Sequence, residues 1–210
     1  LCSLNANEDK YTFSAVFTFD LKHKITSKWI GKTIIHSKRR FSYEEAQERL
    51  ESGEGDLADV LRKVNEIAHK LRKDRFKNGS INFESDEIRF KLDENKKPIG
   101  IYVKERKDAN MLIEDFMLLA NKEVAYFMAK KSSPEIPYIY RVHDQPDIDR
   151  LTDFALFAKE LGFQMKLDTP ANIAKSFNEL AKASEQNELL KVLEPLAIRT
   201  MAKAEYTSNN

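Results

Sequence analysis

The stretch KERKDANMLIEDFMLLANKEV, residues 104–124, carries the pattern from which the fold can be worked out. Wound at about 100° per residue, its apolar side chains gather into one stripe, which predicts an amphipathic helix packed against a core. The stripe consists of Ala109, Leu112, Ile113, Phe116, Met117, Ala120 and Val124. We expect Asp115 on the opposite, outer face of this helix, together with Met111 and Lys122.

Three short polar side chains, Asn110, Glu114 and Asn121, line one edge of this stripe. They place a carboxylate between two carboxamides, and no lysine lies among them. Such a border is either a hydrogen-bond network between packed helices or a polar surface positioned to recognise a ligand. Periodicity alone favours the network between helices.

The segments around this helix alternate between strand and helix patterns. Residues 11–21, YTFSAVFTFDL, alternate apolar and polar side chains and predict a half-buried strand that forms a hairpin with residues 25–37. Residues 88–92 and 99–103 predict a second hairpin around the DENKKP turn, and residues 136–142 a further short strand.

The remaining patterns are helical. FSYEEAQERLES begins with Ser42, and Glu45 three residues later completes a capping box. Further helices are predicted at residues 56–76, at 146–162, from Thr169-Pro170 onward, and from about Glu188 to Glu205 with a break at Pro195. The order predicts an α+β fold in which a mixed β-sheet, built from hairpins, packs against several α-helices.

The composition is that of a globular protein, with 41% hydrophobic and 33% charged residues and a net charge of +1. Bulk charge therefore gives no argument for nucleic acid, and only local clusters can provide one. Cys2 is the single cysteine, which excludes a disulfide framework and indicates a reducing compartment, so we expect a cytoplasmic protein. No apolar run approaches the roughly 18 residues of a membrane helix, so no membrane partner is expected.

The sequence contains no self-sufficient active site. Its four histidines lie far apart and no pair has zinc-ligand spacing. Phosphate-binding and dinucleotide-binding glycine motifs are absent, and no tight aspartate cluster is available for two Mg²⁺ ions. We therefore predict no catalytic residue, no metal ligand and no site for a small-molecule cofactor in these residues.

Two basic clusters lie beside aromatic residues. In HSKRRFSY the cations are Lys38, Arg39 and Arg40, and in HKLRKDRFKNGSINF they are Lys70, Arg72, Lys73, Arg75 and Lys77. Cations that follow a phosphate backbone, next to rings that stack on bases, suit a path for single-stranded nucleic acid. The alternatives are a solvated helix face for the second cluster and a core position for its aromatic residue, Phe83.

Four segments together resemble the catalytic (RNB) domain of the ribonuclease II / ribonuclease R family, and they are closer to the ribonuclease R branch. They are RRFSYEEAQ, FKNGSINF, VKERKDANMLIEDFMLLAN and YRVHDQPD, in the order that the family has. The resemblance extends over nearly the whole chain, from LCSL to RTMAKAEY. It implies a Mg²⁺-dependent, processive 3′-to-5′ exoribonuclease that hydrolyses single-stranded RNA to 5′-mononucleotides.

The same resemblance implies that the catalytic machinery lies elsewhere. In the family, a metal-binding aspartate cluster precedes the LCSL motif, and a T-S-P-I-R-R-Y motif, whose arginine assists at the scissile phosphate, follows the KAEY region. We therefore expect residues 1–210 to be the central part of one catalytic domain, incomplete at both ends and inactive alone. The alternative is a non-catalytic RNA-binding or interaction module.

The resemblance implies RNA-binding roles for Tyr43, Phe83 and Glu114. Tyr43 matches a tyrosine near the 3′ end of the RNA, and Phe83 matches an aromatic residue that clamps the stacked bases. Glu114 matches a glutamate at the 3′-terminal nucleotides and, with Tyr43, is expected to distinguish RNA from DNA through the ribose 2′-hydroxyl. Asn110 and Asn121 can orient this carboxylate. The family often has Glu-Glu where this chain has Glu-Asp, and the first position keeps its glutamate.

Overall fold

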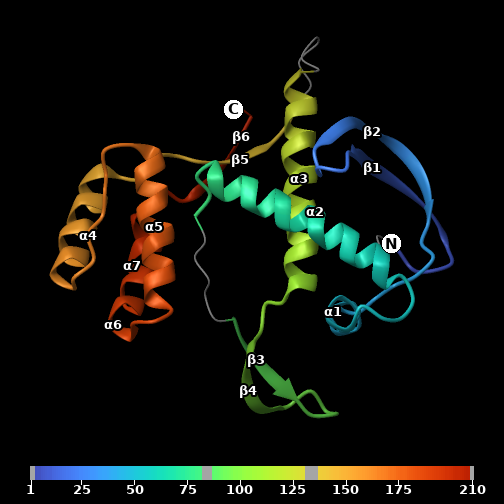
Figure 1. The fold of residues 1–210 in the computed structure, drawn as a ribbon, viewed down its shortest axis with the longest axis horizontal. Helices are drawn as coiled ribbons and strands as arrows, with labels where there is room; N and C mark the ends of the chain where they lie inside the picture. The colour runs from blue at the N-terminus through green and yellow to red at the C-terminus, as the bar shows by residue number, and fades with distance from the viewer. Residues whose placement is uncertain (1–2, 82–86, 131–136, 209–210) are drawn as a thin grey trace. The chain divides into compact units, whose positions relative to one another are not determined.

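The computed structural model describes residues 3–81, 87–130 and 137–208. The chain divides into two compact units, residues 1–73 with 106–136 and residues 74–105 with 137–210, and each is described by itself. The elements of the first unit are β1 (Asp9–Phe19), β2 (Ile25–His36), α1 (Tyr43–Ser52), most of α2 (Ala58–Lys77) and α3 (Asp108–Lys130) (Figure 1).

Strands β1 and β2 form a long antiparallel hairpin, with Asp9 opposite His36 and a bulge at Thr18/Phe19. Only its second half packs as the alternation predicts, where the ring of Phe19 meets Phe116 of α3 edge-on at 6.4 Å. In the first half, Tyr11 is 90% exposed and Phe13 is 80% exposed, so the expectation of a half-buried face is wrong there.

Helix α1 confirms the predicted capping box. The Ser42 hydroxyl accepts from the Glu45 backbone N–H at 3.1 Å, and the Glu45 carboxylate accepts from the Ser42 N–H at 2.8 Å. Gly53 ends the helix at φ +71°, a left-handed conformation that favours glycine. The chain therefore enters and leaves α1 at defined points, which fixes where Tyr43, its first residue, lies.

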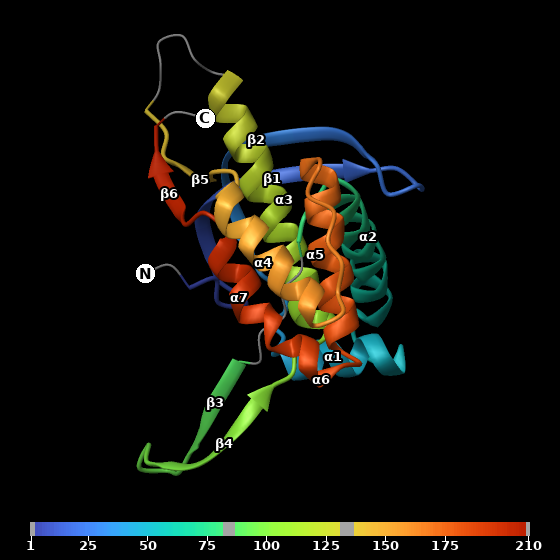
Figure 2. The same ribbon diagram turned by 90° about the vertical axis from the view of Figure 1, so that its left-hand side faces the viewer.

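The second unit contains the remaining elements. They are β3 (Glu87–Leu92), β4 (Pro98–Lys104), β5 (Tyr140–His143), α4 (Ile148–Glu160), α5 (Pro170–Ser184), α6 (Glu188–Lys191), α7 (Leu193–Thr200) and β6 (Ala204–Thr207). Helices α4, α5 and α7 lie side by side and enclose a core (Figure 2). In this core the rings of Phe154 and Phe177 stack at 5.9 Å, and Leu180, Leu193 and Ala197 are fully buried.

The starts of α4 and α5 follow from local sequence. The Asp147 carboxylate accepts from the first backbone N–H groups of α4, and the Thr169 hydroxyl does the same for α5, with Pro170 in the first turn. The last predicted helix is wrong in its extent. It breaks at Val192 rather than at Pro195 and ends at Thr200, after which β6 pairs antiparallel with β5.

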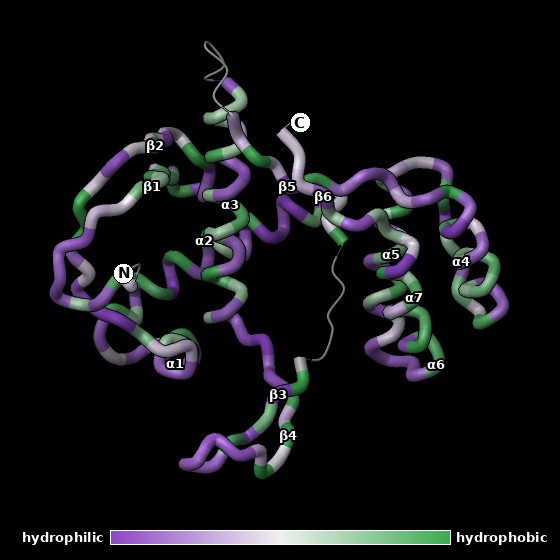
Figure 3. Tube along the Cα trace, turned by 180° about the vertical axis from the view of Figure 1, so that it is seen from behind, coloured by the Kyte–Doolittle hydropathy of each residue, from purple (hydrophilic) through white to green (hydrophobic). Residues whose placement is uncertain are grey.

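The α+β class is confirmed, but the strands do not form one mixed sheet. In the part of the chain that is described they form three two-stranded antiparallel sheets, β1–β2, β3–β4 and β5–β6. Hydrophobic and hydrophilic positions alternate along β3 (Figure 3), and the apolar side chains of β3–β4, among them Phe90 at 62% and Ile101 at 66%, are exposed. No helix among the described residues is long and apolar enough to cross a membrane.

Candidate nucleic-acid interface

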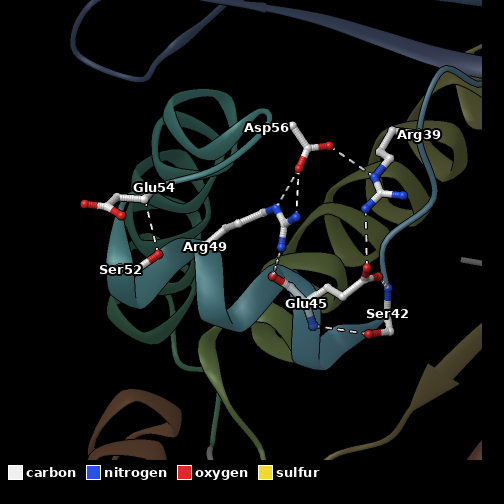
Figure 4. Close-up of polar contacts among 7 residues, drawn as sticks. All are labelled: Arg39, Ser42, Glu45, Arg49, Ser52, Glu54 and Asp56. Carbon is white, nitrogen blue, oxygen red and sulfur yellow. Dashed lines mark hydrogen bonds and ion pairs between the residues drawn. The ribbon is translucent and has the colours of Figure 1, made fainter.

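The first basic cluster lies on the loop that leads into α1, and one of its arginines is held by a network of charges (Figure 4). Arg39 contacts Glu45 at 3.3 Å and Asp56 at 3.1 Å, and Arg49 contacts the same Asp56 at 2.7 Å. The guanidinium groups of Arg39 and Arg49 also lie 4.9 and 5.1 Å from the ring centre of Phe41. Charge pairs and cation–π contacts thus hold the loop against α1.

This network shifts the pKa values of Glu45, Arg49 and Asp56. The backbone N–H of Ser42, which donates to the Glu45 carboxylate, lowers the pKa of Glu45. The hydrogen bond from Arg49 lowers the pKa of Asp56 and raises the pKa of Arg49 itself. All of these groups therefore stay charged at neutral pH.

The other two cations of the cluster have no such partners. Lys38 and Arg40 are exposed, and neither side chain has a hydrogen bond or ion pair within the described ranges. Tyr43, at the first position of α1, is 48% exposed. The loop therefore presents two available cations and one aromatic ring to solvent, on a backbone that the Arg39 and Arg49 contacts hold in place.

Glu114 lies on the exposed side of α3, where its side chain is 42% exposed. Its Oε2 forms an ion pair with Arg106, which is 40% exposed, and Oε1 has no partner among the residues described. The Asn110 Oδ1 accepts instead from the Lys107 backbone N–H at 3.2 Å, and Asn121 is exposed without contacting Glu114. The expectation that the two asparagines orient Glu114 is therefore wrong, and the network between helices is not formed by Glu114 either.

Asp115 corrects the expected face of α3. Its side chain is 1% exposed, and its Oδ2 lies 2.9 Å from both Nε and Nη2 of Arg72 on α2. Ile113 and Met117, expected inside, are 44% and 58% exposed. The buried face of α3 is thus turned toward Leu112 and Asp115, and a charge pair holds it against α2.

The sequence contained a signal for this pairing that the search for apolar stripes missed. His69 and Arg72 lie three residues apart on α2, and Asp108 and Asp115 lie seven residues apart on α3. These spacings place each pair on one helix face. In the structure His69 lies 3.2 Å from Asp108, next to the Arg72–Asp115 pair.

Helices α1 and α3 are joined directly, which relates Tyr43 to Glu114. The Gln47 side-chain oxygen, one turn after Tyr43, accepts from the Ala109 N–H at 2.9 Å, in the first turn of α3. This bond satisfies a backbone donor that a helix start otherwise leaves open. Tyr43 and Glu114 therefore belong to neighbouring helices of one unit, although they do not contact each other. Phe83 lies outside the described residues.

In the second basic cluster some side chains pack against other residues and others are exposed to solvent. Arg72 is committed to Asp115, and the Arg75 guanidinium lies 5.8 Å from the Phe76 ring centre. Lys73 and Lys77 are exposed, and neither has a hydrogen bond or ion pair in the described ranges. Arg72 therefore has a structural role that neither the RNA path nor the solvated helix face predicted, whereas Lys73 and Lys77 lie on a solvated face.

A metal centre is not formed by the residues that the structure describes. No group of three or more histidine, cysteine, aspartate or glutamate side chains converges there. Carboxylates such as Glu45 and Asp56 are paired with arginines instead.

Sequence comparison links the whole chain to known nucleases. The RNB domain family matches residues 1–210. DIS3-like exonuclease 2 of Schizosaccharomyces pombe is 36% identical over 222 residues, covering 98% of this chain and 24% of that protein. Ribonuclease R of Ureaplasma parvum is 33% identical over 219 residues, covering 98% of this chain and 30% of that protein. The chain thus spans about a quarter to a third of the length of these relatives.

Solved structures share the fold. RNase R of Mycoplasma genitalium, in complex with ribose-methylated single-stranded RNA, is 28% identical with a TM-score of 0.85, covering 100% of this chain and 33% of that chain. Yeast Ssd1, a pseudonuclease, is 20% identical with a TM-score of 0.69, covering 97% of this chain and 24% of that chain, which is a likeness of fold alone. Because the family match covers every residue and RNase R shares the fold, the chain belongs to the RNB domain family.

Proposed function

We propose that the chain is part of a processive 3′-to-5′ exoribonuclease that degrades single-stranded RNA to 5′-mononucleotides, and that it supplies part of the wall along which the RNA runs. The observation that carries the proposal is the exposed set of Lys38, Arg40, Tyr43 and Glu114, which two joined helices and one braced loop hold in the first unit. The likeness to RNase R, solved with single-stranded RNA, supports it.

Each member of this set has a role that suits a ribonucleotide. Lys38 and Arg40 attract phosphates, because their charges are not neutralised by a neighbouring carboxylate. Tyr43 offers a ring to a base and a hydroxyl to a sugar or phosphate. Glu114 accepts the ribose 2′-hydroxyl at Oε1, while Arg106 holds Oε2 and so orients the carboxylate.

The proposed cofactor of the enzyme is Mg²⁺, and the described residues do not fit it. They provide no converging set of carboxylates, so no step of the reaction is assigned to them. We propose that the Mg²⁺ ligands lie outside these 210 residues and that the chain alone does not hydrolyse RNA. Incubation with end-labelled single-stranded RNA and Mg²⁺ tests this. The proposal would be contradicted if the chain released mononucleotides and this release were lost when an acidic residue of the chain was replaced.

The second candidate is a non-catalytic RNA-binding module, which the lack of converging carboxylates among the described residues also allows. Both candidates require the RNA contacts, and they differ in hydrolysis alone. Measuring hydrolysis of labelled single-stranded RNA by the full-length protein in the presence of Mg²⁺ separates them. A cytoplasmic location stays a prediction that rests on the single cysteine.

The RNA contacts are tested by the salt dependence of binding. Fluorescence anisotropy with labelled oligo(U) in EDTA measures affinity without hydrolysis. Neutralising two phosphate contacts with Lys38→Gln/Arg40→Gln should reduce the slope of log K against log salt by about 1.4, since each contact contributes about 0.7 on a single strand. At 0.1 M salt this corresponds to roughly 25-fold weaker binding.

The matched control is Lys22→Gln/Lys24→Gln, which removes two exposed cations from the β1–β2 turn of the same unit. It should leave the slope close to that of the unmodified chain. Equal losses from both double variants, or no binding by the unmodified chain, would contradict the proposed surface.

A further inference from the structure

The second unit contains an open groove of about 1000 Å³ that the proposed RNA surface does not include. Its walls are the end of α2 with the turn that follows it, the residues after β5, and one side of α5. Asn178 of α5 donates to the Ser80 carbonyl at 2.9 Å, and a Cβ added at Gly79, which has φ +91°, would lie 3.9 Å from the Cβ of Ala174. The hydrogen bond therefore holds the turn after α2 against α5, and both of them line the groove.

Cations outnumber anions along the rim. Lys77, Lys175 and Lys182 line the groove, against the carboxylates of Asp144 and Glu179. Lys77 and Lys182 have no hydrogen bond or ion pair in the part of the chain that is described. Lys175 has only a contact at 3.7 Å with Glu179, one turn away on the same helix, and such exposed pairs contribute little. The groove therefore offers three lysines whose charges are mainly hydrated, and a negatively charged ligand could replace that water.

The inner surface of the groove is mainly apolar. Its apolar lining includes Phe76, Ile81, Pro146, Ile173 and Met201. Two carboxamides, Asn78 and Gln145, also line it, and neither side chain has a hydrogen-bond partner among the described residues. Apolar surface suits the faces of bases, and free carboxamides suit their edges, so the lining complements a nucleotide better than it complements a plain anion.

We propose that this groove binds a segment of single-stranded RNA, with its phosphates at Lys77, Lys175 and Lys182 and its bases over the apolar lining. A volume of about 1000 Å³ is at the upper end for a small-molecule pocket, which favours a segment of several nucleotides over a single one. The inference rests on the proposed function, because it adds a second RNA contact region to the one at Lys38–Tyr43 and Glu114.

The test uses the whole chain and the same oligo(U) anisotropy assay. Lys175→Gln/Lys182→Gln removes two rim charges, so the salt slope should decrease by about 1.4 and binding at 0.1 M salt should weaken roughly 25-fold. The matched control is Lys159→Gln/Lys191→Gln, two exposed lysines on α4 and α6 of the same unit that do not line the groove. Melting curves of both double variants verify that the fold is kept.

The outcomes separate this inference from the proposed function. If the unmodified chain binds RNA and the rim variant binds as tightly, the proposal that the groove binds RNA is contradicted, while the proposed surface at Lys38 and Arg40 stands. If the unmodified chain does not bind, both fail. If the control variant weakens binding as much as the rim variant, the effect is one of general charge and the groove is again overturned.

Two further measurements identify the occupant. Oligo(U) that contains 4-thiouridine should crosslink under light to peptides carrying residues 76–81 or 170–182, and crosslinks confined to other peptides would overturn the proposal. Uridine 5′-monophosphate or polyglutamate should compete with RNA at the groove poorly. Competition as effective as that of unlabelled RNA would assign the groove to a mononucleotide or to an acidic protein segment instead.

Discussion

The buried pair between Arg72 and Asp115 predicts that two adjacent acidic residues of α3 have very different effects on stability. Asp115 is 1% exposed and accepts from Arg72 at 2.9 Å, whereas Glu114 is 42% exposed in its pair with Arg106. Asp115→Ala leaves the Arg72 guanidinium 17% exposed without its main partner. Breaking a buried pair in this way costs about 3–5 kcal/mol, and removing an exposed one costs about 0–1 kcal/mol.

The lower part of that range is expected for Asp115→Ala, because Asp108 lies 4.0 Å from Nη1 of Arg72 and retains part of the attraction. Urea denaturation followed by circular dichroism measures the free energy of unfolding of each variant. Glu114→Ala should lie within about 1 kcal/mol of the unmodified chain. The double change Arg72→Met/Asp115→Leu should regain most of the loss, since an apolar pair of similar volume replaces a buried ion pair at little cost. A loss below about 1 kcal/mol for Asp115→Ala, or equal losses at both positions, would refute the assigned face of α3.

Three further predictions concern other parts of the fold. Phe177→Ala removes the largest fully buried side chain among the described residues and should cost about 3–5 kcal/mol in the same denaturation assay. Gly31→Ala would place a Cβ 2.6 Å from the ring of Trp29, but this ring is 52% exposed and can turn aside, so the melting temperature should fall only slightly, and Trp29→Leu in the same chain should remove the difference. Because the folded pKa of Glu45 is lowered, its carboxylate stabilises the fold above its ordinary value of 4.5 and loses this effect as the pH falls through the folded pKa. Glu45→Gln should therefore lower the melting temperature at neutral pH and match the unmodified chain in acid; a constant difference would contradict this.

Local patterns predicted the elements whose ends depend on neighbouring residues. The box formed by Ser42 and Glu45, and the Thr169-Pro170 start of α5, follow from hydrogen bonds that span three residues. Asn78-Gly79 likewise ends α2, because the turn needs a residue at positive φ. The residues that interact at these helix ends lie within one helical turn of each other, so a single sequence is enough to identify them.

The features that the patterns missed depend on distant partners. Helix α3 is apolar around much of its circumference, so the apolar stripe alone could not choose its buried face, and Arg72, 43 residues away, decides it. Strand β6 has four residues and pairs with Tyr140–His143, which no local pattern indicates. In the candidate site, too, some features were predicted from the sequence and others depend on distant partners. The resemblance named Tyr43 and Glu114, but the pair between Glu114 and Arg106 and the contact between Arg49 and Phe41 were visible only in the structure.

The burial of Asp115 also determines which control is suitable when the binding of RNA is compared with that of DNA in variants of α3. A variant at Asp115 would confuse recognition with unfolding, so Lys122→Ala, on the exposed side of α3, is the suitable negative control. Tyr43→Phe is the second comparison, because it keeps the ring and removes only the hydroxyl.

The most direct test of the proposed RNA surface compares the affinity of Glu114→Ala for RNA and for the 2′-deoxy oligonucleotide of the same sequence. A hydrogen bond from the 2′-hydroxyl to a carboxylate is worth about 1.5–3 kcal/mol, so RNA binding should weaken by roughly tenfold to a hundredfold. Binding of the deoxy oligonucleotide should change little, and Lys122→Ala should affect neither sugar selectively. If Glu114→Ala remains folded and weakens both oligonucleotides equally, Glu114 does not read the 2′-hydroxyl and the proposed surface loses its basis for choosing RNA.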